Sequence, residues 1–441
     1  MVEQIAVPKQ AVGEHGWRVT FAGMGINLAL GILYTWSVIR DGIPAEWGWT
    51  DTDKALPYIF CCLIFSLVMV PAGRMQDKFG PRVTAAIGGV LVGIGFIIAS
   101  MARTPILFVI GFGILAGSGI GFGYASATPP AVKWFPPAKT GMIAGIVVSG
   151  FGLAAVYAAP LASWLLENYG IQKMMFILGV GFLVIITGVK TIITPLWFGL
   201  SQMLQSPDPD LQQLKLLQGN MAKNSAETKK PVEHDKDNLT PKEMLCTVQF
   251  YMLWFMYACG AGAGLMIISV AKKIVVTAEI ANALAVAAVM GLALGNGGGR
   301  IAAGMISDKI GRKATMFIFF VSQAVLIFLL SRAQGDSFLA SAPALIIITA
   351  LIGANYGANL TLFPSITKDY YGLKNFGVNY GLVFTAWGVG GFMLAFLAGK
   401  MYDIHQTFNI AYYGASSLLI LAAIMVLFIK PPHHLASESA A

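Results

Sequence analysis

Hydrophobic residues along this chain gather in twelve long runs that short polar segments separate. Most runs have about 20 residues, which is the length a helix needs to cross the hydrocarbon core of a bilayer. We therefore predict twelve transmembrane helices over residues 17–39, 55–75, 83–102, 105–129, 141–164, 172–197, 248–270, 278–306, 314–331, 341–364, 376–399 and 407–429.

One long polar stretch, residues 201–242, divides the runs into two sets of six. It contains prolines and clustered charges, so we interpret it as a flexible tether. At its end, Thr240-Pro-Lys-Glu243 fits a capping box, which predicts that a helix of the second half begins there. The predicted division is a tail over 1–16, a six-helix bundle over 17–200, the linker over 201–242, a second bundle over 243–430 and a tail over 431–441.

Composition supports a membrane protein. Of 441 residues, 56% are hydrophobic and only 11% are charged, whereas a soluble domain has about 25% charged residues. The net charge of +8 comes from basic residues scattered over short loops, so no nucleic-acid-binding face is expected. Most of these residues fall on the side of the termini and the linker, which the positive-inside rule assigns to the cytoplasm. We expect an integral plasma-membrane protein, a monomer in the lipid bilayer, with cytoplasmic N- and C-termini.

The two halves repeat each other. A G-x-x-x-D-[KR]-x-G-x-[RK] segment follows the second predicted helix and returns after the eighth. Its two copies are Gly73, Asp77, Lys78, Gly80 and Arg82, and Gly304, Asp308, Lys309, Gly311 and Arg312. We interpret the first glycine as permitting close helix approach, the acid as meeting a helix N-terminus, and the second glycine as turning the chain. Glycines 141, 145 and 152 likewise recur as 377, 381 and 388.

This duplicated loop resembles the hallmark of the major facilitator superfamily, in which it acts as a conformational gating motif. The resemblance implies an all-α membrane protein of the major facilitator fold, with 12 transmembrane helices in two pseudo-symmetric six-helix bundles. It also implies a substrate site near the membrane midplane, between the bundles.

Arg300 follows Gly295-Asn-Gly-Gly-Gly and is the only charged residue deep inside a hydrophobic run. An arginine at bilayer depth costs about 2.5–3.5 kcal/mol on insertion scales, and no Asp or Glu lies mid-run to pair with it. A mobile carboxylate would suit its planar fork, and a single cation suits a monoanion. The alternative is a structural arginine bonded to backbone carbonyls or a helix end. The glycines before it would admit a small ligand, let the helix bend, or serve tight packing.

Polar and aromatic residues in the middle of other runs are the remaining candidates for binding substrate, although packing or interfacial anchoring is the alternative for each aromatic. The candidate substrate-binding residues are Arg300, Asn296, Tyr34, Tyr124, Tyr356, Asn27, Asn359 and Trp387. No metal site or cofactor is expected, and without a nucleophile beside a base or a phosphate-binding loop we do not expect an enzyme.

Five segments resemble the oxalate/formate antiporter family and the related monocarboxylate transporters: 34–38, 243–254, 296–300, 362–364 and 379–381. The resemblance implies that Arg300 binds a substrate carboxylate and that Tyr34, Tyr124 and Tyr356 line the cavity. Two departures matter. Trp387 stands where oxalate exchangers of the family have a lysine, and Asn296 stands where animal proton-coupled transporters have an aspartate.

These patterns predict a secondary active transporter of small monocarboxylates, such as lactate, pyruvate or formate, that works by alternating access. Proton coupling is expected, with the proton on another residue or on the substrate, since the Asn296 amide does not titrate. One alternative is an anion exchanger of the oxalate/formate type. Another is a carboxylate sensor that moves nothing, against which the lack of a sizeable soluble output domain argues.

Overall fold

The computed structural model describes residues 9–132, 140–205, 238–276, 282–335, 337–372 and 375–432. Several predictions concern residues outside these ranges: residues 1–8 and 433–441 of the two outer tails, most of the linker and the first residues of the eighth run. The side chains of Asp77 and Lys78 in the first loop motif also lie outside the described part.

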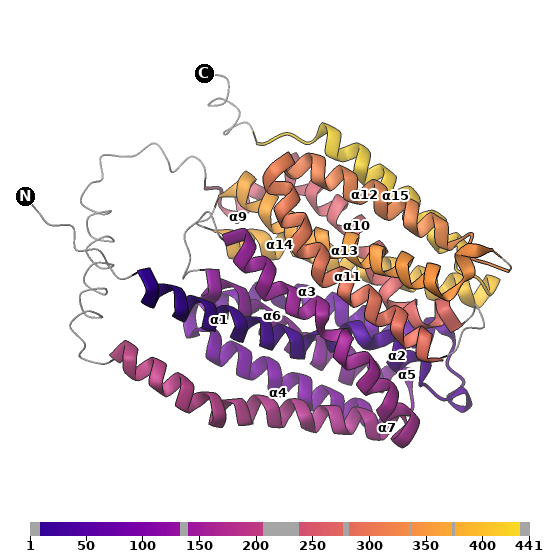
Figure 1. Ribbon diagram of the computed structural model, residues 1–441, viewed down its shortest axis with the longest axis horizontal. Coiled ribbons are helices and arrows are strands. Elements are labelled where there is room, and N and C mark those ends of the chain that lie inside the picture. Colours follow the sequence, from indigo (N-terminus) through magenta and orange to yellow (C-terminus); the bar gives the residue numbers. More distant parts are fainter. Residues whose placement is uncertain are drawn as a thin grey trace, which may run out of the picture.

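The chain folds into two helical halves that lie side by side (Figure 1). The N-terminal half contains α1 (Lys9–Leu30), η1 (Gly31–Thr35), α2 (Trp36–Asp41), η2 (Ala45–Trp47), α3 (Asp51–Phe79), α4 (Pro81–Ser100), α5 (Pro105–Phe108), η3 (Val109–Ala116), α6 (Gly117–Val132) and α7 (Thr140–Gln205). The C-terminal half contains α9 (Pro241–Leu245), α10 (Val248–Val276), α11 (Asn282–Ile310), α12 (Arg312–Leu330), η6 (Phe338–Ala340), α13 (Ala342–Tyr371), α14 (Phe376–His405) and α15 (Asn409–Phe428).

The predicted spans correspond to helices throughout the described residues. Eleven helices there are long and apolar enough to cross a membrane. One of them, Met142–Val184, contains most of the fifth predicted span and the first part of the sixth. Gly170, with a φ of +73°, interrupts the helix between these two spans. The helices also reach past the expected boundaries, since α1 begins at Lys9 and α7 continues to Gln205. The capping box at Thr240 is confirmed, with the Thr240 amide donating to Glu243 Oε2 at 2.7 Å.

The first span is not one regular helix. A short 3-10 segment, η1, separates α1 from α2, and such tightened segments within a helix often mark functional positions. Gly31 opens this segment where a Cβ would overlap Ala154 and the Phe151 carbonyl of α7. The bare backbone therefore lets η1 lie directly against α7, and this contact positions Tyr34 in the interior.

Helix ends define two ends of the bundle. The start of α1, the short helix α9 and the end of α15 lie at one end (Figure 1). There the Leu239 carbonyl accepts hydrogen bonds from the side-chain amides of Asn375 and Asn379, at 3.1 and 3.0 Å. We call the opposite end, where α2, α10 and α14 finish and α3 begins, the distal end.

The halves meet mainly through α3 with α14 and through α7 with α11. One pair of the repeated glycines, Gly152 and Gly388, lies at these two contacts. A Cβ on Gly152 of α7 would lie 3.0 Å from the Gly297 amide of α11, and one on Gly388 of α14 would lie 2.7 Å from the Cys62 carbonyl of α3. The sequence repeat therefore marks equivalent close approaches of the two halves.

The loop motifs follow the predicted pattern only in part. Gly80 and Gly311 turn the chain with φ of +81° and +86°, as expected. The interpretation of the first glycine is wrong, because a Cβ would meet nothing within 4 Å at Gly73 and only Thr361 at 3.4 Å at Gly304. The second acid bonds to the motif's own base: Arg312 Nη1 donates to Asp308 at 2.7 Å, and its Nε donates to Asp369 at 3.1 Å.

Gly311→Ala is expected to destabilise the protein. At a φ of +86° and a ψ of 157° a side chain would cost about 1–3 kcal/mol, since this backbone region is essentially confined to glycine. The matched control is Gly304→Ala in the same motif, where helical backbone and an ordinary 3.4 Å contact favour alanine. Thermal unfolding of both variants in detergent measures the difference, and equal midpoints would contradict it.

Candidate functional site

Arg300 lies on α11 at the contact between the halves and is fully buried. Its guanidinium donates from Nη1 to the Val148 carbonyl of α7 at 2.6 Å and from Nε to Asn296 Oδ1, one helical turn earlier, at 3.1 Å. A longer contact of 3.4 Å joins Nη2 to the Tyr34 hydroxyl. The side chain therefore bridges the two halves through neutral acceptors.

A chain of hydrogen bonds continues from Tyr34 across the interface. Its hydroxyl shares a 2.6 Å hydrogen bond with the Tyr356 hydroxyl of α13, and the Trp387 indole of α14 donates to the same Tyr356 oxygen at 2.8 Å. All three side chains are at most 2% exposed. These hydrogen bonds join residues of η1, α11, α13 and α14 into one buried polar cluster. We call it the Arg300 group; its members are Arg300, Asn296, Tyr34, Tyr356 and Trp387.

Aromatic rings enclose this group. Tyr34 packs edge-on against Phe151 of α7, and Tyr124 of α6 packs edge-on against the same ring, with centroids 5.0 and 5.4 Å apart. Phe65 of α3 contacts Trp387 at 5.0 Å. The surroundings are therefore apolar apart from the hydroxyls and the guanidinium, as in many small-molecule sites.

Three of the four glycines just before Arg300 serve close packing, and at the fourth, Gly298, a side chain would meet nothing within 4 Å. Side chains at Gly295 and Gly299 would overlap the backbone of Ala350 and Ala354 in α13, and one at Gly297 would lie 2.6 Å from Leu153 of α7. Of the three sequence interpretations for this stretch, tight packing is the one that these contacts support. Because the turn before Arg300 carries almost no side chains, α11 packs closely against both α13 and α7 there.

Two further predicted residues lie outside the Arg300 group. Asn27 donates to the Val147 carbonyl at 2.9 Å, which joins α1 to α7. Asn359 donates to the Asn355 carbonyl at 3.1 Å and lies close to Gly260 of α10. Within the described part of the chain neither donates to or accepts from Arg300, so both lie apart from it and their binding of substrate stays a prediction.

The polar group has more donors than acceptors. A guanidinium has five N–H groups, and the three hydrogen bonds above use one each. Asn296 Nδ2 is buried without a partner, and the hydrogen bond between the Tyr34 and Tyr356 hydroxyls uses only one of their two protons. Among the described residues no Asp or Glu forms an ion pair with Arg300. A buried cation and spare donors favour an acceptor-rich, negatively charged ligand.

Sequence reasoning missed two important groups. The Val148 carbonyl cannot be read from a sequence, because every residue has one. Gly152 was noted only as part of a repeat, yet its Cβ would lie 3.2 Å from both Arg300 Nε and Asn296 Cγ. Its position in the repeat was the available signal. For metals, no group of three or more His, Cys, Asp or Glu that could hold an ion occurs among the described residues.

Three known proteins resemble the chain over most of its length. It is 27% identical over 379 residues to the MFS-type transporter YhjX of Escherichia coli (strain K12), covering 85% of each chain. It is 26% identical over 390 residues to the oxalate:formate antiporter of Oxalobacter formigenes, covering 85% of this chain and 82% of that one. The structure of the xylose transporter XylE from E. coli superimposes with a TM-score of 0.66 at 15% identity, covering 95% of this chain and all of that one.

A shorter similarity, 24% identity over 168 residues, links 38% of this chain to monocarboxylate transporter 11 of Mus musculus. The family model of the Major Facilitator Superfamily matches residues 19–330 and 253–441. Together the two matches span both helical halves. With the duplicated loop motif and the shared fold, they show that this chain belongs to the Major Facilitator Superfamily and is a secondary transporter.

Proposed function

We propose that this transporter moves small monocarboxylates, such as lactate, pyruvate or formate, and that Arg300 binds their carboxylate. The observation that supports this most is the donor excess around a fully buried guanidinium. A carboxylate offers four lone-pair sites to these donors and neutralises the charge.

The bonds of Arg300 indicate how a substrate would enter the group. Its contacts to the Val148 carbonyl and the Tyr34 hydroxyl reach across to the other half, whereas its bond to Asn296 stays within α11. A carboxylate would replace the hydrogen bonds to Val148 and Tyr34, and the remaining bond to Asn296 would orient the guanidinium. Substrate binding would then break the same hydrogen bonds that join Arg300 to the opposite half, and so would favour relative motion of the two halves.

A single positive charge favours a monoanion over a dianion. Trp387 donates one neutral N–H to Tyr356 and adds no charge to the site. A dianion such as oxalate would keep one charge without a partner in an apolar surrounding, which is costly. The oxalate:formate antiporter among the relatives makes oxalate exchange the second candidate.

We also propose that the distal end faces the cell exterior, because most basic residues of the sequence fall in segments at the other end. Proton coupling remains a prediction, with the proton carried by the substrate or by a residue outside the Arg300 group.

Uptake by purified protein in liposomes tests the proposal. We expect labelled L-lactate and pyruvate to enter, and unlabelled lactamide, the neutral analogue of lactate, to compete at least about tenfold more weakly, since hydrogen bonds to charged groups contribute about 1.5–3 kcal/mol. Equal competition by lactamide would contradict a carboxylate site. Uptake driven by internal oxalate, without lactate transport, would support the exchanger instead.

A further inference from the structure

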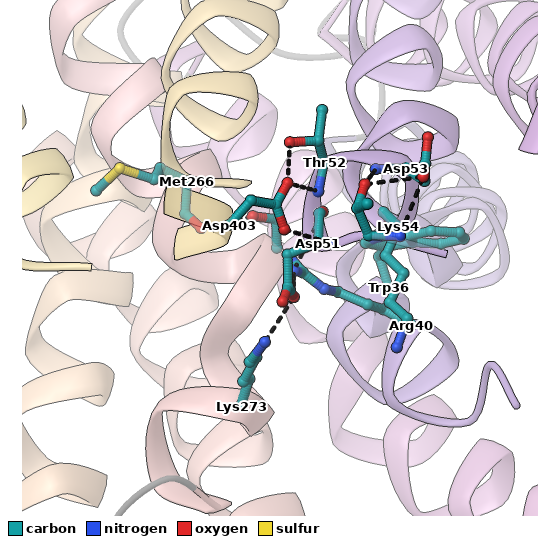
Figure 2. Close-up of polar contacts among 11 residues, drawn as sticks. Trp36, Arg40, Asp51, Thr52, Asp53, Lys54, Met266, Lys273 and Asp403 are labelled. Atoms are coloured by element: carbon teal, nitrogen blue, oxygen red, sulfur yellow. Dashed lines mark hydrogen bonds and ion pairs between the residues drawn. The ribbon is translucent and has the colours of Figure 1, made fainter. Parts of the chain in front are cut away.

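A second set of charges joins the halves at the distal end, where Arg40 of α2 and Lys273 of α10 both bond to Asp51 of α3 (Figure 2). The Lys273–Asp51 pair crosses the interface at 2.6 Å. From the C-terminal half, Asp403 accepts from the Asp51 and Thr52 amides at 2.7 and 2.9 Å and so caps the N-terminus of α3. These contacts hold the distal end closed.

A second ion pair at the distal end has only one residue on each side of the interface. Lys272 of α10 forms an ion pair with Asp41 of α2 across the same interface, at 2.8 Å between Nζ and Oδ2. The lysine side chain is 7% exposed and that of Asp41 is 37% exposed. Removing one partner of such a buried pair leaves the other charge without its counter-ion, and here the two partners belong to opposite halves.

The charges divide unequally between the halves. Lys272, Lys273 and Asp403 belong to the C-terminal half, whereas Arg40 and its partner Asp51 both belong to the N-terminal half, together with Asp41. When the halves separate at this end, Arg40 keeps Asp51, whereas Lys272 moves away from Asp41 and Lys273 moves away from Asp51. Both lysines then remain at the distal end of α10 in the C-terminal half, which also carries Arg300 on α11.

We propose that Lys272 and Lys273 form an entry site for the substrate carboxylate at the distal mouth. In the closed state Asp41 and Asp51 occupy this site, and in the open state a small carboxylate replaces them before it moves to Arg300. The inference rests on the proposed function, since it needs a carboxylate substrate and opening at this end. Asp403, the acid of the same half, is engaged by α3 while the end is closed and lowers the positive charge when it opens.

Two physical arguments support the entry site. The lysines already bind carboxylates of the same chemistry as the substrate, so the geometry for recognition exists. Cations along one wall of a narrow opening also raise the local concentration of anions and speed their association. A purely mechanical lock would work equally well with the charges distributed the other way between the halves.

Lys272→Gln and Asp41→Asn distinguish a substrate entry site from an ion pair that only holds the distal end closed, because each variant removes the charge of one partner of the same pair. If the pair only locks the distal end, both variants loosen it and shift KM in the same direction. If the lysine also binds substrate, Lys272→Gln raises KM for distal substrate about fivefold, roughly the effect of one partly exposed ion pair. Asp41→Asn removes the competing carboxylate and leaves KM unchanged or lower.

The measurement is the initial rate of labelled L-lactate uptake into right-side-out and inside-out vesicles, so that one preparation presents the distal end. Detergent gel filtration verifies that both variants fold, and Lys272→Arg should retain a KM near that of the wild type. Equal shifts for Lys272→Gln and Asp41→Asn, with active wild type, would overturn the entry site alone. Wild-type protein that moves neither lactate nor pyruvate would overturn the proposed function and the entry site together.

Discussion

Arg300→Lys should reduce uptake of L-lactate and pyruvate by at least about 100-fold, although it keeps the positive charge. An ammonium is a compact point charge and cannot contact Val148, Asn296 and Tyr34 at once, as the guanidinium does. Hydrogen bonds to charged groups contribute about 1.5–3 kcal/mol each, which corresponds to roughly tenfold to more than 100-fold in binding. Arg300→Gln removes the charge as well and should be at least as severe.

Arg103, whose side chain is exposed at the distal end of the N-terminal half, provides the matched control. Arg103→Lys and Arg103→Gln should keep near wild-type uptake in the same liposomes. Purified Arg300 variants must elute as folded protein, so that lost uptake reflects lost binding. If Arg300→Lys transported at the wild-type rate, Arg300 would be a structural arginine.

The second large effect is expected for Gly152→Val. A Cβ at this position would lie 3.0 Å from the Gly297 amide and 3.2 Å from Arg300 Nε, and the valine methyl groups would extend further toward the guanidinium. Such overpacking typically costs about 1–3 kcal/mol. Because α7 and α11 meet here, we expect at least about a tenfold loss of uptake and a smaller loss for Gly152→Ala.

Gly145→Val tests whether the effect is local, since Gly145 lies on the same helix and a Cβ there would meet nothing within 4 Å. Uptake by this control should stay close to wild type. A similar loss in both variants would mean that valine harms α7 in general. Wild-type uptake by Gly152→Val would mean that the Arg300 group tolerates displacement of its neighbouring helix.

Much of the fold could be predicted because a membrane simplifies the problem. Each span must satisfy its own backbone hydrogen bonds as a helix, so long apolar runs identified spans wherever the structure describes them. The capping box at Thr240 and the turns at Gly80 and Gly311 were predictable for a similar reason, since they depend on neighbours within a few residues.

The break at η1 was not predicted. Its cause is the approach of Gly31 to Ala154 and Phe151 of α7, and this approach depends on the packing of a helix more than 100 residues away in the chain. The role given to Gly73 failed for the same reason. Whether a glycine lies against another helix depends on what packs there, and the sequence around it contains no such information.

By itself the sequence determined that the chain spans a membrane in two related halves, and that Arg300 is the costly charge around which a site would form. Both follow from free energies that depend on residue type and local position. Only the tertiary structure decided that Tyr34 meets Tyr356, 322 residues away, that the Val148 carbonyl accepts from Arg300, and that Lys272 faces Asp41. These contacts depend on how the two halves pack against each other, because a backbone carbonyl or a distant partner leaves no mark on the local pattern of residues.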